Sequence, residues 1–113
     1  MKYVYFDILG NKAPRFLKPL KSVTVNEGAT AELHIRVNGK PLPKIQWMKD
    51  GVALKEDDRM EMNTEYDEEN HEVESSLSIR KMTTKDARHE YGVMASNKFG
   101  TVKHTFSITG ISL

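Results

Sequence analysis

Two histidine–glutamate pairs, His71-Glu72 and His89-Glu90, are the residues of this sequence that come nearest to a metal-dependent catalytic motif. A zinc-protease helix begins with the same dipeptide and needs a second histidine four residues after the first. Those positions hold Ser75 and Val93. The pairs also fall in segments whose pattern indicates a strand and a corner rather than a helix. The sequence therefore predicts no metal site.

Other chemistry is also missing from the sequence. No two glycines lie closer than eight residues apart, which excludes a glycine-rich phosphate loop, and no serine stands in a G-x-S-x-G elbow. Basic residues are scattered and are not interleaved with aromatic residues as in a nucleic-acid platform. His34 should face outward from its strand, and His104 shares a face with Phe106, as expected of an edge histidine. We therefore expect no catalysis, no cofactor and no nucleic-acid partner.

Acidic residues are concentrated in one segment, residues 56–74, which holds ten carboxylates and a single base, Arg59. The rest of the chain holds sixteen bases and six acids, so that the whole carries a formal charge of +1. Two carboxylates could serve a hydrolase, but an exposed hairpin implies no concave pocket. The segment is either a solvated edge that resists aggregation or a docking surface for a basic partner. Its acids are Glu56, Asp57, Asp58, Glu61, Glu65, Asp67, Glu68, Glu69, Glu72 and Glu74.

Several absences bear on the compartment. The chain of 113 residues, which fits one domain, has no cysteine and no Asn-X-Ser/Thr acceptor. Its first residues do not resemble a secretory signal, and no stretch reaches the roughly 20 apolar residues of a membrane span. We expect a soluble, cytoplasmic protein with no membrane partner.

Apolar residues recur with a period of two, which is typical of strands with one buried face. Turn residues at 38–43, 50–51 and 67–70 separate the runs. One short helical turn is expected within residues 82–89, with Thr84 as its cap. Seven or more such runs predict an all-β antiparallel sandwich or barrel. Six of these runs are residues 29–37, 44–49, 59–66, 71–80, 90–97 and 101–109.

Two motifs resemble the intermediate-set (I-set) immunoglobulin domain: W-x-K-D-G at Trp47–Gly51, and Y-x-V-x-A-x-N-x-x-G at Tyr91–Gly100. The resemblance covers about residues 14–109 and implies a two-sheet antiparallel sandwich. In that family a disulfide joins the sheets and packs on the tryptophan. Here Ile35 and Val93 stand at the two cysteine positions, so the domain is expected to lack the bridge.

The resemblance implies further roles for single residues. Trp47 and Leu77 should join Ile35 and Val93 in the core, and Tyr91 should bond back to the backbone as a tyrosine corner. An ion pair between Arg59 and Asp86 is also implied. The spacing from Asp86 to Tyr91 is longer than usual, and His89 replaces a frequent glycine, which counts against that pair.

Disulfide-free domains that begin like Pro14–Leu20 resemble modules of intracellular muscle scaffolds of the titin, twitchin, obscurin and palladin type. The resemblance implies a non-catalytic structural and protein-interaction module of the sarcomere or actin cytoskeleton. It would bear load and dock partners through strand edges and loops. Its partners would be neighbouring immunoglobulin or fibronectin modules, or thick- or thin-filament proteins. The alternative is a targeting or regulatory module of a twitchin-like or myosin light-chain kinase-like enzyme.

Residues 1–13 are predicted to be an N-terminal extension or linker, and residues 14–113 the I-set domain. The extension is rich in β-prone residues and is either a linker or an interaction segment that adds a strand to an edge. That edge could belong to this domain, to a neighbouring domain or to a second copy, so we expect a monomer or a weak dimer. The residues concerned are Tyr3, Val4, Tyr5, Phe6, Ile8 and Leu9.

Overall fold

The alternation of apolar and polar residues becomes an alternation of buried and exposed side chains in a computed structural model, which describes residues 10–18, 20 and 22–111. In the strand at residues 31–40, Ala31, Leu33, Ile35 and Val37 are buried, while Glu32 and His34 are exposed. The described strands are β1 (Lys12–Lys18), β2 (Val23–Asn26), β3 (Ala31–Lys40), β4 (Lys44–Lys49), β5 (Val52–Ala53), β6 (Met60–Asp67), β7 (Glu72–Ile79), β8 (Glu90–Asn97) and β9 (Gly100–Ile111).

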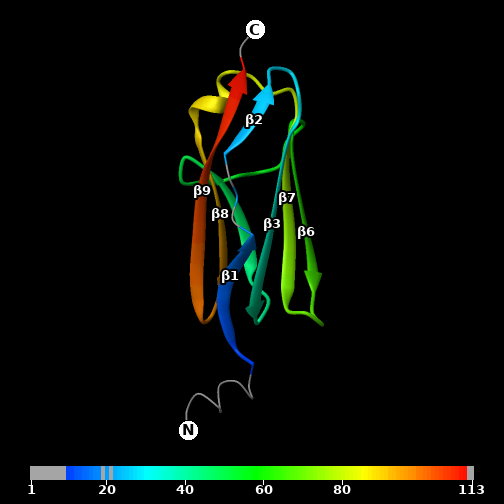
Figure 1. Cartoon of the computed structure of the whole chain (residues 1–113), viewed down its shortest axis with the longest axis vertical. Helices are drawn as coiled ribbons and strands as arrows, with labels where there is room; N and C mark the ends of the chain where they lie inside the picture. Colours follow the sequence, from blue (N-terminus) through cyan, green and yellow to red (C-terminus); the bar gives the residue numbers. More distant parts are fainter. Residues whose placement is uncertain (1–9, 19, 21, 112–113) are drawn as a thin grey trace.

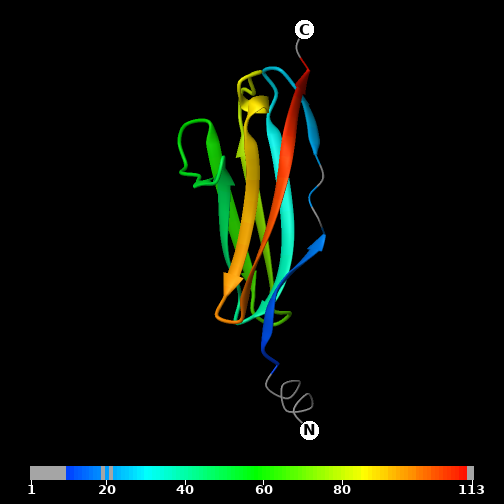
Figure 2. The same ribbon diagram turned by 90° about the vertical axis from the view of Figure 1, so that its left-hand side faces the viewer.

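The strands form two sheets that face each other (Figures 1 and 2). The first sheet has the order β1-β3-β7-β6, and the second has the order β2-β9-β8-β4-β5. Neighbours are antiparallel except β2 and β9, which are parallel. The predicted immunoglobulin-like sandwich without a disulfide is therefore confirmed.

Tight turns fix the register of the hairpins. Asp50 and Gly51 join β4 to β5 with φ of 52° and 79°, the positive values that a two-residue hairpin turn requires. At the next tip, the Asp67 side chain accepts hydrogen bonds from the backbone N–H of Asn70 and from its Nδ2, at 3.0 and 2.9 Å. The tip predicted at residues 67–70 thus joins β6 to β7.

The short helical turn expected within residues 82–89 is present. The only helix among the described residues is a 3-10 turn, η1 (Asp86–Arg88), and no side chain caps it at Lys85. The prediction that Thr84 caps this turn is therefore wrong. Instead Thr83 bonds to Asp86, donating from its N–H at 2.8 Å and from its hydroxyl at 3.1 Å.

Candidate interaction surfaces

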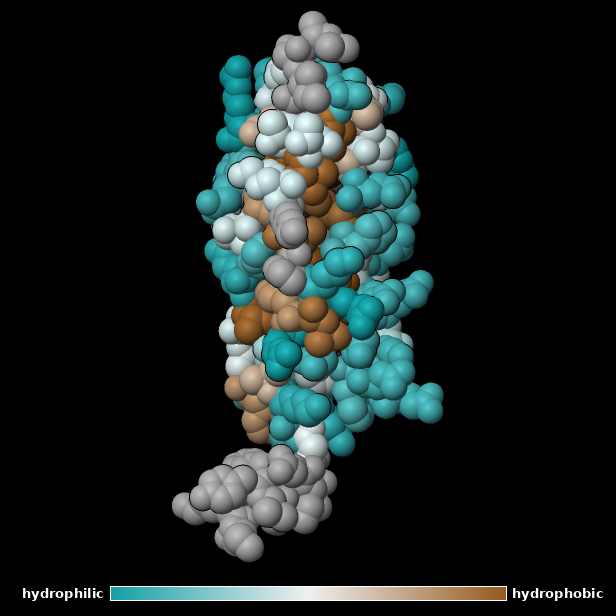
Figure 3. Space-filling model, viewed as in Figure 1, coloured by the Kyte–Doolittle hydropathy of each residue, from teal (hydrophilic) through white to brown (hydrophobic). Residues whose placement is uncertain are grey.

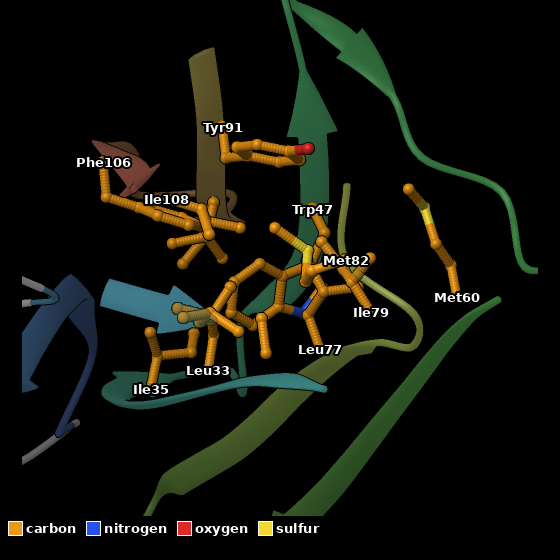
Figure 4. Close-up of a cluster of buried hydrophobic side chains, with 14 of the residues drawn as sticks. Leu33, Ile35, Trp47, Met60, Leu77, Ile79, Met82, Tyr91, Phe106 and Ile108 are labelled. Atoms are coloured by element: carbon orange, nitrogen blue, oxygen red, sulfur yellow. The ribbon is translucent and has the colours of Figure 1, made fainter. Parts of the chain in front are cut away.

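The core positions singled out from the sequence lie together between the sheets (Figure 4). Ile35 is 3 % exposed and Trp47 2 %, while Leu77, Tyr91 and Val93 are fully buried. Trp47 of β4 lies opposite Val93 of β8. The two positions that the resemblance assigns to a cystine are thus filled by aliphatic side chains in the cluster that holds the indole.

A buried hydroxyl that bonds to the indole joins the two sheets. The Trp47 Nε1–H donates to Ser75 Oγ of β7 at 2.9 Å. Ser75 Oγ in turn donates to the Asn63 carbonyl at 3.1 Å and lies 2.9 Å from Thr64 Oγ1. The alternation in residues 71–80 places Ser75 on the same side as Val73, Leu77 and Ile79, but gives it no role. Its position as the single polar residue on the inward side of β7 was the available signal.

The corner before β8 is held by the tyrosine and by an ion pair. The Tyr91 hydroxyl donates to the Asp86 carbonyl at 2.9 Å. Arg59 Nη2 lies 2.6 Å from Asp86 Oδ2, and the same guanidinium donates to the carbonyls of Arg80 and Lys81 at 3.1 Å each. The expectation that the long Asp86–Tyr91 spacing weakens this pair is wrong, because the turn η1 takes up the additional residue.

Burial and the ion pair act in opposite directions on the pKa of Asp86. Burial raises this pKa, but the Arg59 guanidinium and the two Thr83 donors hold it below its usual value. Burial, with the Asp86 charge nearby, raises the pKa of Tyr91 to about 12. At neutral pH the corner therefore combines a carboxylate with a protonated phenol that can donate.

The histidines do not gather into a site. Asp50 Oδ1 accepts from the Glu90 N–H at 2.9 Å, and Asp50 Oδ2 lies 2.6 Å from His89 Nδ1. These two bonds lower the pKa of Asp50, the Glu90 bond more than the His89 bond. His104 Nε2 contacts the Leu20 carbonyl, and His34 faces solvent. Across the described residues no three His, Cys, Asp or Glu side chains are placed to hold a metal ion. In this part of the chain there is also no helix with the length and apolar character of a membrane span.

The ten carboxylates of residues 56–74 divide into two groups. Half of them are engaged: Glu56 and Asp57 accept backbone N–H groups, Glu61 pairs with Arg80, Glu72 pairs with Arg36, and Asp67 holds the hairpin tip. Asp58, Glu65, Glu68, Glu69 and Glu74 have no side-chain partner among the described residues. The acidity of the hairpin is therefore only partly neutralised within the domain.

The outer face of the first sheet is hollowed, contrary to the expectation that the hairpin has no concave surface. One hollow of about 610 Å³ lies between basic and acidic side chains, with Lys18 and Arg36 on one side and Glu65 and Glu74 on the other. A second, of about 220 Å³, lies beside it and is lined by Glu65, Tyr66, Asp67, Glu72 and Glu74. We call Glu65, Asp67, Glu72 and Glu74 the acidic face.

The predicted interaction segment of Tyr3, Val4, Tyr5, Phe6, Ile8 and Leu9 lies outside the described residues, so its role stays a prediction. Strand β1 begins at Lys12 and pairs with β3. It therefore includes two residues that the sequence assigned to the extension. The Asn97 side chain donates to the Lys12 carbonyl at 2.7 Å and to the Pro41 carbonyl at 2.9 Å. The β8–β9 turn is thereby tied to β1.

The sequence profile of the family described as "Immunoglobulin I-set domain" matches residues 14–109. This chain belongs to the immunoglobulin I-set family. The I-set domain is 33 % identical to the muscle M-line assembly protein unc-89 of Caenorhabditis elegans over 89 % of its own length. It is 36 % identical to the human slow-type myosin-binding protein C over 88 % of its length. It spans 1 % and 8 % of these two proteins, respectively.

Solved structures agree with this assignment. The I-set domain superposes on a chain of the complex of titin M10 with the obscurin-like 1 immunoglobulin domain, with a TM-score of 0.75 and 28 % identity, covering 88 % of this chain and 95 % of that one. It also matches the twitchin kinase region of C. elegans, with a TM-score of 0.74 and 26 % identity, covering 88 % of this chain and 17 % of that one. The domain is thus similar to immunoglobulin domains of muscle proteins.

Proposed function

We propose that this I-set domain is a non-catalytic structural and protein-interaction module of a cytoplasmic muscle scaffold, where it bears load along its long axis. The observation that carries the proposal is the parallel pairing of β2 with β9, from Val23 opposite Ile108 to Asn26 opposite Ile111. The chain enters this pair at the start of β2 and leaves it at the end of β9, at opposite ends of the ladder (Figure 1). Tension on the chain would load all bonds of the ladder together, as shear.

The family membership and the muscle relatives support this role, since two of these relatives are an M-line assembly protein and a myosin-binding protein. The similarity to the twitchin kinase region supports a second candidate, a targeting or regulatory module beside a kinase. In both cases the domain would act by binding rather than by catalysis.

Single-molecule pulling on two matched variants tests the mechanical role. Because the chain has no cysteine, one engineered cysteine can carry the handle while the other handle stays at the C-terminus. Ser22→Cys and Glu27→Cys place the handle immediately before and after β2, both at exposed positions. Pulling from residue 22 shears the β2–β9 ladder, whereas pulling from residue 27 opens it one bond at a time.

We expect a several-fold higher unfolding force from residue 22 than from residue 27. The two variants should have equal free energies of unfolding in urea, which shows that only the pulling direction differs. Equal forces in the two geometries would contradict the mechanical proposal.

A further inference from the structure

The outer edge of β6 has a covered half and an open half. β6 is the last strand of the first sheet, with β7 on its only paired side. The Met60 N–H donates to an Asp57 carboxylate oxygen at 2.8 Å, and the Met60 carbonyl accepts from the Asp57 N–H at 3.2 Å. The Met62 N–H donates to Glu56 Oε1 at 2.9 Å. The loop before β6 thus occupies the edge as far as Met62.

The edge beyond Met62 is open. Backbone groups of a strand alternate in direction, so the N–H and C=O groups of Thr64 and Tyr66 point the same way as those of Met60 and Met62. Among the residues that the structure describes, no hydrogen bond reaches these groups from that side. An edge with free donors and acceptors is a template for another strand.

The acidic face borders this open half. Glu65 lies directly opposite Glu74 in the β6–β7 ladder, and Asp67 lies opposite Glu72. Glu72 already pairs with Arg36, but Glu65 and Glu74 have no side-chain partner among the described residues. Like charges in directly opposite positions are unfavourable, so a cation beside Glu65 and Glu74 would be stabilising. Figure 3 shows hydrophilic side chains over the β6 and β7 side of the molecule, and the smaller hollow lies among them.

The charge also argues against a second copy at this edge. Pairing β6 with β6 of another molecule would bring two acidic faces together. An extended segment with positive side chains has the complementary charge.

We propose that the open half of the β6 edge, residues 64–67, accepts an extended segment of a partner protein in which basic residues alternate with β-branched or aromatic residues. This proposal rests on the proposed role as an interaction module and names the class of partner. Side chains two residues apart on an added strand are about 7 Å apart and share a face of the sheet. The basic residues would lie beside Glu65 and Asp67. The residues between them would contact the ring of Tyr66, which is 57 % exposed.

A short capped peptide in which lysine alternates with valine and threonine is a direct probe. Binding is followed by NMR titration, and hydrogen exchange of single amides is measured in the complex. We expect exchange at Thr64 and Tyr66 to slow when the peptide binds. Exchange at Met62, whose N–H is already bonded to Glu56, should not change.

Two matched double variants distinguish an effect of the acidic face on binding from an effect of the overall negative charge of the hairpin. E65Q/E74Q removes two charges from the acidic face, and E68Q/E69Q removes two from the hairpin tip. We expect E65Q/E74Q to weaken peptide binding about tenfold and E68Q/E69Q less than about twofold. A peptide N-methylated on the side facing the edge keeps its charge but cannot pair, and it should lose binding.

Three results with the peptide would overturn the proposal. They are an alternating peptide that does not bind, equal weakening by the two double variants, and full binding of the N-methylated peptide. Self-association of the free domain through Thr64 and Tyr66 would assign the edge to a second copy and would also overturn it. None of these results changes the comparison of pulling from residues 22 and 27, so the two proposals fail separately.

Discussion

Ser75 is a single residue that links the two sheets through the core. Its Oγ accepts a hydrogen bond from the indole N–H of Trp47 on the opposite sheet. Ser75 is 3 % exposed. Every buried side-chain polar atom in the described part of the chain has a hydrogen-bond partner. Removing one partner from such a pair leaves the other desolvated and unsatisfied, which is more destabilising than the loss of the bond alone.

Replacing Ser75 with alanine should lower the free energy of unfolding by about 1–3 kcal/mol, because the Trp47 N–H and the Thr64 hydroxyl lose a buried partner. Urea unfolding of the wild type and the variant measures this difference. Ser78→Ala on the outer side of the same strand is the control and should change stability by less than about 0.5 kcal/mol. Equal effects of the two substitutions would show that the inter-sheet bond contributes nothing measurable.

At the scale of elements, the Arg59–Asp86 pair connects the start of β6 to the turn before β8. Asp86 is 5 % exposed, and its pKa is lowered in the folded state although burial opposes this. A group with a lowered pKa binds its proton less tightly when folded than when unfolded. Its contribution to stability is therefore present above the unfolded value of 3.8 and is lost as the pH falls through the lower folded value.

Asp86→Asn should lower the free energy of unfolding at neutral pH by about 1–3 kcal/mol, a range that allows for the partly exposed Arg59. The difference from the wild type should shrink as the pH falls below 3.8. Urea titrations at a series of pH values measure this. Asp58→Asn, at an exposed carboxylate with no side-chain partner among the described residues, should give a curve parallel to the wild type. A pH-independent deficit in Asp86→Asn would contradict the assignment.

The strands were predictable from the sequence because a period of two converts directly into one buried face. Residues 31–37 and 73–79 show this, since every apolar residue of these two runs is buried. The contacts between elements were not predictable. The Trp47–Ser75 bond joins residues 28 positions apart in the chain, and it depends on how the two sheets pack against each other. The open half of β6 exists because β6 is the last strand of its sheet. Spacing along the chain also could not show that a 3-10 turn preserves the Arg59–Asp86 pair.

At the scale of the whole molecule, the two proposed roles use different sheets. The β2–β9 ladder belongs to the second sheet, and the open edge of β6 belongs to the first. The acidic segment thus lies outside the sheet that is proposed to carry the load. A partner bound to the β6 edge would neither add hydrogen bonds to the β2–β9 ladder nor break any.

The alternating peptide should therefore leave the unfolding force measured from residue 22 nearly unchanged when it is present at saturating concentration. Pulling experiments with and without the peptide measure this, and E65Q/E74Q is the control that does not bind. A marked rise in force with the peptide in the wild type alone would show that the two sheets are mechanically coupled.

Trp47 is the only tryptophan of the chain and lies 2 % exposed between the sheets, with the Phe106 ring at 6.2 Å in an edge orientation. Its fluorescence consequently reports on the interior alone, with no second indole to subtract. Emission should shift to longer wavelength when water reaches the ring. The natural chain is thus its own optical probe, and every variant described above can be followed without a dye.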